Sequence, residues 1–141
     1  MAAAIAQQCF ALRVPIDLNP DAAWVAYTLV RTERRERDDD PRFKHYSRSG
    51  VPVEALGCEI WISELATGRS RNLTDGQGSA RGPSWSPVGD KLAFYWDRDG
   101  LAQLWIWDRS SERLHRADEA VVRPFFGFEV MAGSNAPMAC C

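Results

Sequence analysis

The feature that most constrains this chain is an internal repeat of turns and short apolar strands. Segment 18–27 (LNPDAAWVAY) matches 85–94 (WSPVGDKLAF) at a displacement of 67 residues, and 59–64 (EIWISE) matches 103–108 (QLWIWD) at a displacement of 44 residues. The difference of 23 residues is an insertion in the first copy, between the two matching segments. A sheet-forming unit repeated in this way cannot bury its faces alone, so each copy needs a neighbour to cover it.

The apolar segments of the repeat lack the polar–apolar alternation of a strand with one solvated face. Residues 92–96 (LAFYW) and 104–107 (LWIW) are apolar throughout, which indicates strands covered on both faces. Only residues 97–102 separate them, whereas a parallel connection needs about a dozen residues or more. The pair is therefore predicted to be an antiparallel hairpin, closed by a turn at 97–100 (DRDG).

A proline-containing turn opens both copies. Residues 86–89 (SPVG) fit a type I turn with Gly in the fourth position, and 19–22 (NPDA) place Ala22 where that glycine would be. If the backbone is left-handed at this position, Ala22 costs roughly 1 kcal/mol relative to glycine.

The repeat predicts an all-β fold, and no strong helical periodicity appears anywhere in the chain. A period near 44 residues falls in the range of four-stranded propeller blades, and antiparallel sheets covered on both faces fit blades stacked around an axis. We expect a partial β-propeller, with two four-stranded antiparallel blades and the start of a third. The predicted strands lie near 14–18, 24–31, 59–65 and 69–73 in the first blade, and near 82–86, 91–96, 103–108 and 112–116 in the second.

These strands divide the chain into four parts. They are an N-terminal tail at 1–13, a first blade at 14–74 with an inserted loop at 32–58, a second blade at 75–120, and the start of a third blade with an irregular tail at 121–141.

The composition is that of an ordinary globular domain. The 141 residues are 45% hydrophobic and 26% charged, with a formal net charge of −2. A nearly neutral chain has no bulk attraction to nucleic acid or to an anionic membrane, and no apolar run approaches the roughly 18 residues of a membrane span. We therefore expect neither nucleic acid nor membrane among its partners.

The cysteines and the first residues bear on location and cofactors. Cys9, Cys58, Cys140 and Cys141 show no C-x-x-C spacing, so neither a zinc site nor a redox motif is predicted. The apolar start lacks a preceding basic region and is too short for a secretory signal. We expect a cytoplasmic protein, with a periplasmic location as the alternative, and no metal or other cofactor.

Neither histidine falls in a motif that would make it a catalytic base. His45 is in the inserted loop and His115 is at the end of a predicted edge strand, and a base needs an orienting partner and a nucleophile within reach. The G-x-S-x-G segment that presents a nucleophilic serine is absent, because the Gly-Ser steps at 78–79 and 133–134 do not continue in that pattern. We predict no catalytic residue in this chain.

The densest charged run, 31–40 (RTERRERDDD), holds four arginines and five acids. Its functional alternatives are a contact with a substrate or partner domain, and a divalent ion at 38–40. A solvated loop is the preferred interpretation, because three consecutive carboxylates do not converge on one ion without other ligands.

Most of the tryptophans fall within predicted strands. Since the net charge is negative, burial between blades is favoured over stacking on bases or sugars. The tryptophans in these strand patterns are Trp61, Trp85, Trp96, Trp105 and Trp107.

Segment 82–94 (GPSWSPVGDKLAF) resembles the repeat of TolB-like β-propellers, whose signature is P-x-W-S-P-D-G-x-x-L-A-F. The continuation through 97–108 matches the same repeat, and 72–74 (NLT) resembles the end of the preceding blade. Val88 departs from the signature, which has Asp there; this removes a local side-chain hydrogen bond but keeps the turn. The resemblance covers roughly residues 14–128 and implies propeller blades.

The first copy, in which 24–27 (WVAY) follows an N-P-D turn, resembles the opening blade of prolyl oligopeptidase-type serine peptidases. In that family an N-terminal propeller covers a C-terminal α/β-hydrolase domain and restricts access to its active site. Propellers typically have four to eight blades, and only two full repeats are found here. The resemblance thus implies an N-terminal piece of a longer protein, partnered by the rest of the propeller, the hydrolase domain and a peptide substrate.

Two functions follow from these resemblances. The first is a non-catalytic gating module that controls substrate access in a prolyl oligopeptidase-like peptidase, whose catalytic groups would lie elsewhere. The alternative is a TolB-like propeller scaffold for protein–protein interaction. Because an unclosed propeller leaves apolar faces uncovered, we also expect the 141-residue chain to be marginally stable, and either to self-associate or to need the rest of a propeller.

Overall fold

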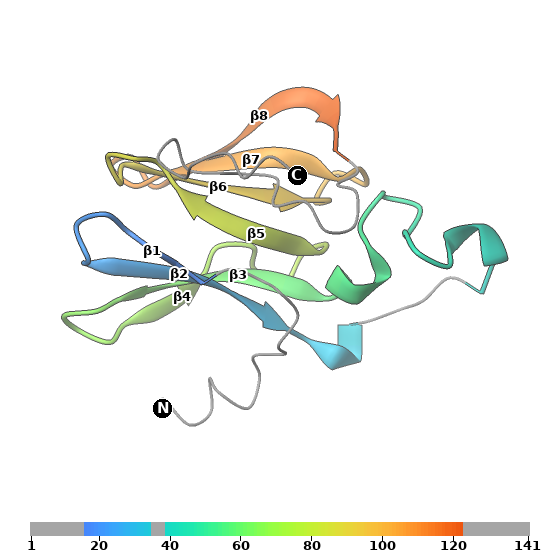
Figure 1. The fold of residues 1–141 in the computed structure, drawn as a ribbon, viewed down its shortest axis with the longest axis horizontal. Coiled ribbons are helices and arrows are strands. Elements are labelled where there is room, and N and C mark those ends of the chain that lie inside the picture. The colour runs from blue at the N-terminus through green and yellow to red at the C-terminus, as the bar shows by residue number, and fades with distance from the viewer. Residues whose placement is uncertain (1–15, 35–38, 123–141) are drawn as a thin grey trace, which may run out of the picture.

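The computed structural model describes residues 16–34 and 39–122, which form two four-stranded antiparallel sheets (Figure 1). The first sheet, blade 1, has the strand order β1-β2-β3-β4, and the second, blade 2, has the order β5-β6-β7-β8. The strands of blade 1 are β1 (Asp17–Leu18), β2 (Trp24–Val30), β3 (Cys58–Glu64) and β4 (Ser70–Asn72). The strands of blade 2 are β5 (Ala80–Trp85), β6 (Lys91–Trp96), β7 (Gln103–Asp108) and β8 (Arg113–Val121).

The predicted all-β fold with two four-stranded antiparallel blades is confirmed. No α-helix occurs in the described part of the chain, and the insertion contributes three short 3₁₀ turns, at Thr32–Arg34, Pro41–Phe43 and Val53–Ala55. The predicted antiparallel hairpin of β6 and β7 is present, with Phe94 opposite Trp105. The predicted start of a third blade lies outside the described residues from 123 onward.

One strand differs clearly from its predicted length. The sequence suggested that the last strand of blade 2 ends near residue 116, but β8 continues to Val121, which pairs with Gln103. The segment 117–120 gives no strand pattern, and it lies at a register shift between the pairs Trp105–Arg116 and Gln103–Val121. The Gln103 side-chain amide also donates to the Glu119 carbonyl at 3.0 Å. His115 therefore lies near the start of this edge strand rather than at its end.

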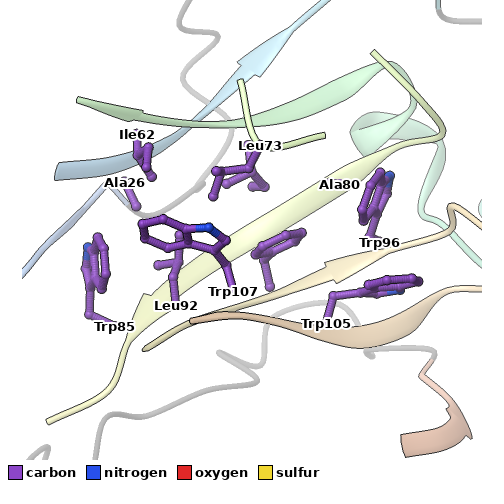
Figure 2. Packing of buried hydrophobic residues seen from close by; sticks show 11 residues of the cluster. Ala26, Ile62, Leu73, Ala80, Trp85, Leu92, Trp96, Trp105 and Trp107 are labelled. Carbon is purple, nitrogen blue, oxygen red and sulfur yellow. The ribbon is translucent and has the colours of Figure 1, made fainter. Parts of the chain in front are cut away.

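The two sheets pack face to face, and their facing sides form the main core (Figure 2). Because side chains alternate across a strand, each sheet has a near face toward the other sheet and a far face on the opposite side. The near face of blade 1 is aliphatic and small, and that of blade 2 is mostly aromatic. The buried members of this core are Ala26, Ile60, Ile62 and Leu73 from blade 1, and Ala80, Trp85, Leu92, Phe94, Trp96, Trp105 and Trp107 from blade 2.

The aromatic near face of blade 2 is held by edge-on ring contacts. Trp85 and Trp107 meet with ring centroids 6.1 Å apart, and Trp96 and Trp105 with centroids 5.1 Å apart. Such pairs add about 0.5–1.5 kcal/mol to the burial of their surface. Arg71 of blade 1 lies 5.1 Å from the Trp107 ring centroid and so joins the two sheets by a cation–π contact.

The prediction that the strand tryptophans are buried between blades is right for these four and wrong for Trp61. Trp61 is half-buried on the far face of blade 1, and its indole nitrogen donates to Glu59 at 3.1 Å. The insertion shifts no register here; Trp61 alternates with Ile60 and Ile62, which take the near-face positions. An apolar strand pattern does not reveal which of its two faces meets the neighbouring sheet.

Connections of the two sheets gather at opposite ends, which we call the turn end and the loop end. The turn end holds the two proline turns, where Ala22 N donates to Asn19 O and Gly89 N donates to Ser86 O. Ala22 has φ +54° and the equivalent residue of blade 2, Gly89, has φ +72°, so the backbone is left-handed at both positions. The loop end holds the insertion (31–57), the blade connection (73–79) and the hairpin turn (97–102).

Polar contacts at the turn end fasten one blade to the other. The Asp17 carboxylate accepts from Trp85 N at 2.6 Å, and the buried Asn19 amide donates to Gly89 O at 2.9 Å. Arg109 pairs with Asp21 at 2.7 Å across the same junction. These bonds fix the angle between the blades in addition to the apolar core.

Candidate functional site at the loop end

The two histidines and their surroundings form no catalytic constellation in the described part of the chain. His45 is exposed in the insertion and His115 is exposed on β8. Neither imidazole has a hydrogen-bond partner among residues 16–34 and 39–122. A histidine acts as a base only when a nucleophile and an orienting group lie within hydrogen-bond reach. Neither site supplies that arrangement.

The acidic run does not gather into an ion site where it is described. Asp38 lies outside the described residues and Asp39 is exposed. Asp40 begins the 3₁₀ turn Pro41–Phe43 and accepts from Arg42 N at 3.0 Å and from Arg42 Nη2 at 2.6 Å. The Arg42 side chain, followed by its backbone N–H, holds the pKa of the Asp40 carboxyl below its usual range. Asp40 thus serves as a local cap.

The arginines of the same run behave differently from the predicted solvated loop. Arg31 and Arg34 both reach Glu59 on β3, with nitrogen–oxygen distances of 3.3 Å and 3.1 Å. The Glu59 side chain is 4% exposed, and each arginine side chain is about one-third exposed, at 35% and 32%. The start of the insertion is therefore pinned to blade 1 by charge.

The buried Glu59 carboxylate accepts hydrogen bonds from four side chains. Besides the two guanidinium groups, it accepts from Trp61 Nε1 at 3.1 Å and from Asn72 Nδ2 at 2.9 Å. Burying a carboxylate costs several kcal/mol unless partners replace the lost water, and these four donors do so. The repeat offered a signal for this site, because Gln103 occupies the equivalent position in blade 2.

The second half of the insertion packs against both blades as a separate apolar cluster. Its members are Val30, Val51, Ala55, Leu56, Cys58 and Ala102, with Val53 packed against them. Val51 and Ala102 are both fully buried, although they come from the insertion and from the hairpin turn of blade 2. These apolar side chains cover one end of both sheets, so this part of the insertion belongs to the packed structure.

A polar junction beside this cluster ties the insertion to blade 2. Ser49 Oγ donates to Asp97 Oδ2 at 2.5 Å, and Ala102 N donates to Ser49 O at 2.7 Å. The other oxygen of Asp97 accepts from Ser79 N at 2.5 Å. Ser79 in turn accepts from Gly57 N at 3.0 Å through its hydroxyl. The insertion thus clamps the blade connection and the hairpin turn together.

Beyond this clamp, the insertion projects from the loop end as a basic and aromatic tip (Figure 1). Two guanidinium groups contact its half-buried Phe43 ring: that of Arg48 at 4.6 Å from the ring centroid and that of Arg42 at 5.8 Å. Lys44 and His45 are exposed beside it. These side chains belong to neither apolar core cluster, so the tip is a candidate contact surface.

Arg81 at the start of β5 is the other notable cation of the loop end. Its guanidinium stacks on the Tyr95 ring, 5.4 Å from the centroid, and its two terminal nitrogens are buried with no hydrogen-bond partner. Burial lowers the pKa of the Arg81 guanidinium and raises the pKa of the Tyr95 hydroxyl. Nothing in the sequence pattern distinguished Arg81 from an ordinary surface arginine.

The loop end presents charged and aromatic side chains. Within the described residues no three His, Cys, Asp or Glu side chains are grouped as metal ligands would be. None of the elements described here is a helix long and apolar enough to cross a membrane. The loop end therefore offers cations, aromatic rings and a rigid clamp.

Comparison with known proteins identifies the architecture. A solved structure assigned as TolB from Agrobacterium tumefaciens superimposes with a TM-score of 0.51 at 20% identity, over 74% of this chain and 30% of that chain. Two TolB-like propeller blades are present. The TolB structure from Acinetobacter baumannii is more distant, with a TM-score of 0.46 and 23% identity over 77% of this chain and 22% of that one.

One curated protein shares closer sequence similarity over a shorter stretch. The uncharacterized peptidase YuxL of Bacillus subtilis (strain 168) is 50% identical over 64 residues, which is 43% of this chain and 10% of that protein. No family model matches the chain. The chain thus spans a small part of the length of the proteins it resembles.

Proposed function

We propose that these blades belong to a non-catalytic propeller that controls access of peptide substrates to the hydrolase domain of a prolyl oligopeptidase-like serine peptidase. The observation that carries the proposal is the 50% identity over 64 residues to a protein named as a peptidase. The described residues contribute a sheet framework and a loop end without a nucleophile–base pair. In this role the blades form part of a wall that admits short, unfolded peptides.

The topology of the sheets supports this role for the loop end. In a four-stranded up-and-down sheet, the chain joins and leaves the blade at the same end, and the connection 73–79 between the blades lies there. A domain linked to the propeller through its first or last blade would therefore lie near the loop end. The insertion and its basic, aromatic tip project from that end (Figure 1).

A second candidate is a TolB-like scaffold that binds another protein through its blades. This alternative requires only the propeller fold, which the TM-score of 0.51 to the Agrobacterium structure supports. The two functions share the propeller and differ in whether a hydrolase domain belongs to the same polypeptide.

Reading the gene beyond codon 141, in every frame, separates the two candidates. Further blades followed by a G-x-S-x-G segment are expected for the peptidase. Further blades with no such segment would overturn the gating proposal and favour the scaffold.

A labelling experiment tests whether the 141-residue chain is non-catalytic by itself. The purified chain is expected to react with a fluorophosphonate probe no faster than the denatured chain, and to leave short peptide esters intact. Faster labelling of the native chain would locate an activated serine within it and contradict the proposed role.

A further inference from the structure

An exposed arginine lies over the aromatic core of blade 2 at the loop end. Arg98 belongs to the hairpin turn between β6 and β7, and its guanidinium carbon is 5.2 Å from the ring centroid of Trp96 and 5.5 Å from that of Trp105. These two rings lie at the same end of the core, meet edge-on and are almost fully buried (Figure 2). A guanidinium held on such a support is oriented before a ligand arrives, so binding costs it less conformational entropy.

The contacts of Arg98 with the rings leave its N–H donors without an acceptor. No residue among 16–34 and 39–122 accepts a hydrogen bond from Arg98 or forms an ion pair with it. A guanidinium presents five N–H donors in its own plane, in a fork that matches a carboxylate. Because Arg98 is exposed, these donors can be reached by a ligand.

The two acids beside Arg98 in the sequence are engaged with other donors. Asp97 accepts at one oxygen from the Ser49 hydroxyl and at the other from a backbone N–H of the blade connection, both at 2.5 Å. Asp99 lies 3.9 Å from a guanidinium nitrogen of Arg116. The carboxylate that would complete the fork of Arg98 is therefore absent from its own turn.

A second arginine supported by an aromatic ring is fastened to the same turn. Arg48 is exposed at the insertion tip, with its guanidinium carbon 4.6 Å from the Phe43 centroid. Its neighbour Ser49 donates to Asp97, which is the neighbour of Arg98. The two cations thus stand on adjacent segments that are hydrogen-bonded to each other, so their separation is fixed by the clamp at the loop end.

We propose that Arg98 and Arg48 form a binding site for acidic segments of polypeptide, in which Arg98 holds a carboxylate through two parallel N–H···O bonds. Arginine forms such bidentate pairs with carboxylates, and they are stronger than neutral hydrogen bonds. The polypeptide nature of the ligand rests on the proposed function, since the loop end is where a linked domain would lie. A net charge of −2 gives the chain no bulk attraction to nucleic acid.

Binding of a labelled acidic peptide tests the proposal on the 141-residue chain. The probe is hexaglutamate carrying a fluorescent label, followed by fluorescence anisotropy at about 0.1 M salt, where charges farther apart than about 10 Å are screened. The unaltered chain is expected to bind it with a dissociation constant of about 0.1 mM. Hexaglutamine with the same label should not bind; equal binding of the two peptides, or no binding of hexaglutamate, overturns the proposal.

A matched set of arginine substitutions locates the site. Arg98→Gln should weaken binding about tenfold, because the charge-assisted pair is lost, and Arg48→Gln about threefold. The control is Arg113→Gln, which removes the same charge from an exposed position at the turn end and should leave the affinity nearly unchanged. Equal weakening by Arg98→Gln and Arg113→Gln would reveal a non-specific charge effect and overturn the proposal.

A conservative variant keeps the test valid if Arg98→Gln does not fold. Arg98→Lys retains a cation over the rings but lacks the fork, so it should bind hexaglutamate about threefold more weakly. Circular dichroism first establishes that each variant is folded, and a folded Arg98→Lys chain that binds like the unaltered one overturns the proposal. The measurement needs no hydrolase domain: binding that depends on Arg98 would stand even if the gene beyond codon 141 lacked a G-x-S-x-G segment, and the ligand would then belong to the scaffold.

Discussion

Equivalent positions of blade 1 and blade 2 have different surroundings. Trp61 corresponds to Trp105, but the first is half-buried on a far face and the second is 6% exposed in the core. Glu59 corresponds to Gln103, and the charged member is the one beside the insertion. The comparison teaches that the repeat determines the backbone, whereas the neighbouring element determines which side chain each position needs.

The insertion accounts for much of this difference. Blade 2 turns from β6 to β7 in six residues, 97–102, and its core is closed by rings. Blade 1 connects β2 to β3 through 31–57, which adds an apolar cluster and a buried ion-pair network. Blade 1 thus depends more on polar contacts, and blade 2 more on aromatic packing.

Truncating the equivalent tryptophans should reveal the largest difference between the blades. Trp105→Ala removes a buried ring that meets Trp96 edge-on, and is expected to lower the free energy of unfolding by about 3–5 kcal/mol. Trp61→Ala removes a half-buried ring and is expected to cost about half as much. Urea unfolding at low protein concentration measures both, and equal losses would contradict the assignment of Trp61 to a far face.

Neutralising the buried carboxylate tests the dependence of blade 1 on charge. Glu59→Gln leaves Arg31 and Arg34 without their carboxylate and should lower the free energy of unfolding. Because solvent partly screens both guanidinium groups, the loss should be limited to about 2 kcal/mol. The matched control in blade 2 is Gln103→Ala, which removes a neutral amide and its bond to the Glu119 carbonyl. It should cost about 1 kcal/mol. A Glu59→Gln variant as stable as the original chain would show that the network is not stabilising.

Exchanging residues between the proline turns should have opposite effects in the two blades. Gly89→Ala is expected to destabilise by about 2 kcal/mol, because φ is +72° and the new Cβ would collide with the Asn19 side chain. Ala22→Gly relieves the left-handed strain at φ +54° and should stabilise by up to about 1 kcal/mol. Thermal unfolding of both variants checks the signs, and a destabilised Ala22→Gly chain would refute the strain argument.

The smallest expected effect concerns the acid stability of the turn between β7 and β8 of blade 2. Backbone and hydroxyl donors of Ser111 and Ser110 lower the pKa of Asp108 from 3.8 to about 2. The folded pKa lies below the unfolded value, so the contribution of Asp108 is fully present above pH 3.8 and is lost as the pH falls through about 2. Asp108→Asn should therefore lower the melting temperature above pH 4, and the difference from the original chain should shrink toward pH 2.

The equivalent turn of blade 1 supplies the control for this pH effect. Glu64 occupies the position of Asp108 and accepts from the exposed Thr67 hydroxyl at 2.6 Å rather than from a set of backbone N–H groups. Glu64→Gln should leave the melting temperature nearly unchanged across the same pH range. If Asp108→Asn lowered the melting temperature equally at every pH, the removal of the Asp108 carboxylate would act through packing and not through charge.

The sequence by itself determined the framework of the molecule. Apolar runs separated by short turns, a repeat near 44 residues and the proline turns were sufficient to predict two antiparallel four-stranded sheets and the central hairpin. These features are local: strand alternation, turn chemistry and hairpin length each depend on a few consecutive residues. The same reasoning predicted no catalytic residue, and that remains a prediction.

Only the tertiary structure decided which faces meet and what the insertion does. Trp61 and Trp105 look alike as strand residues, and a single sequence does not say which face of an apolar strand is covered. The charged run at 31–40 looked solvated because its partner, Glu59, lies 28 residues from Arg31 in the chain. Contacts between distant segments depend on the packing of whole sheets, so the clamp at the loop end became visible only once both blades were in place.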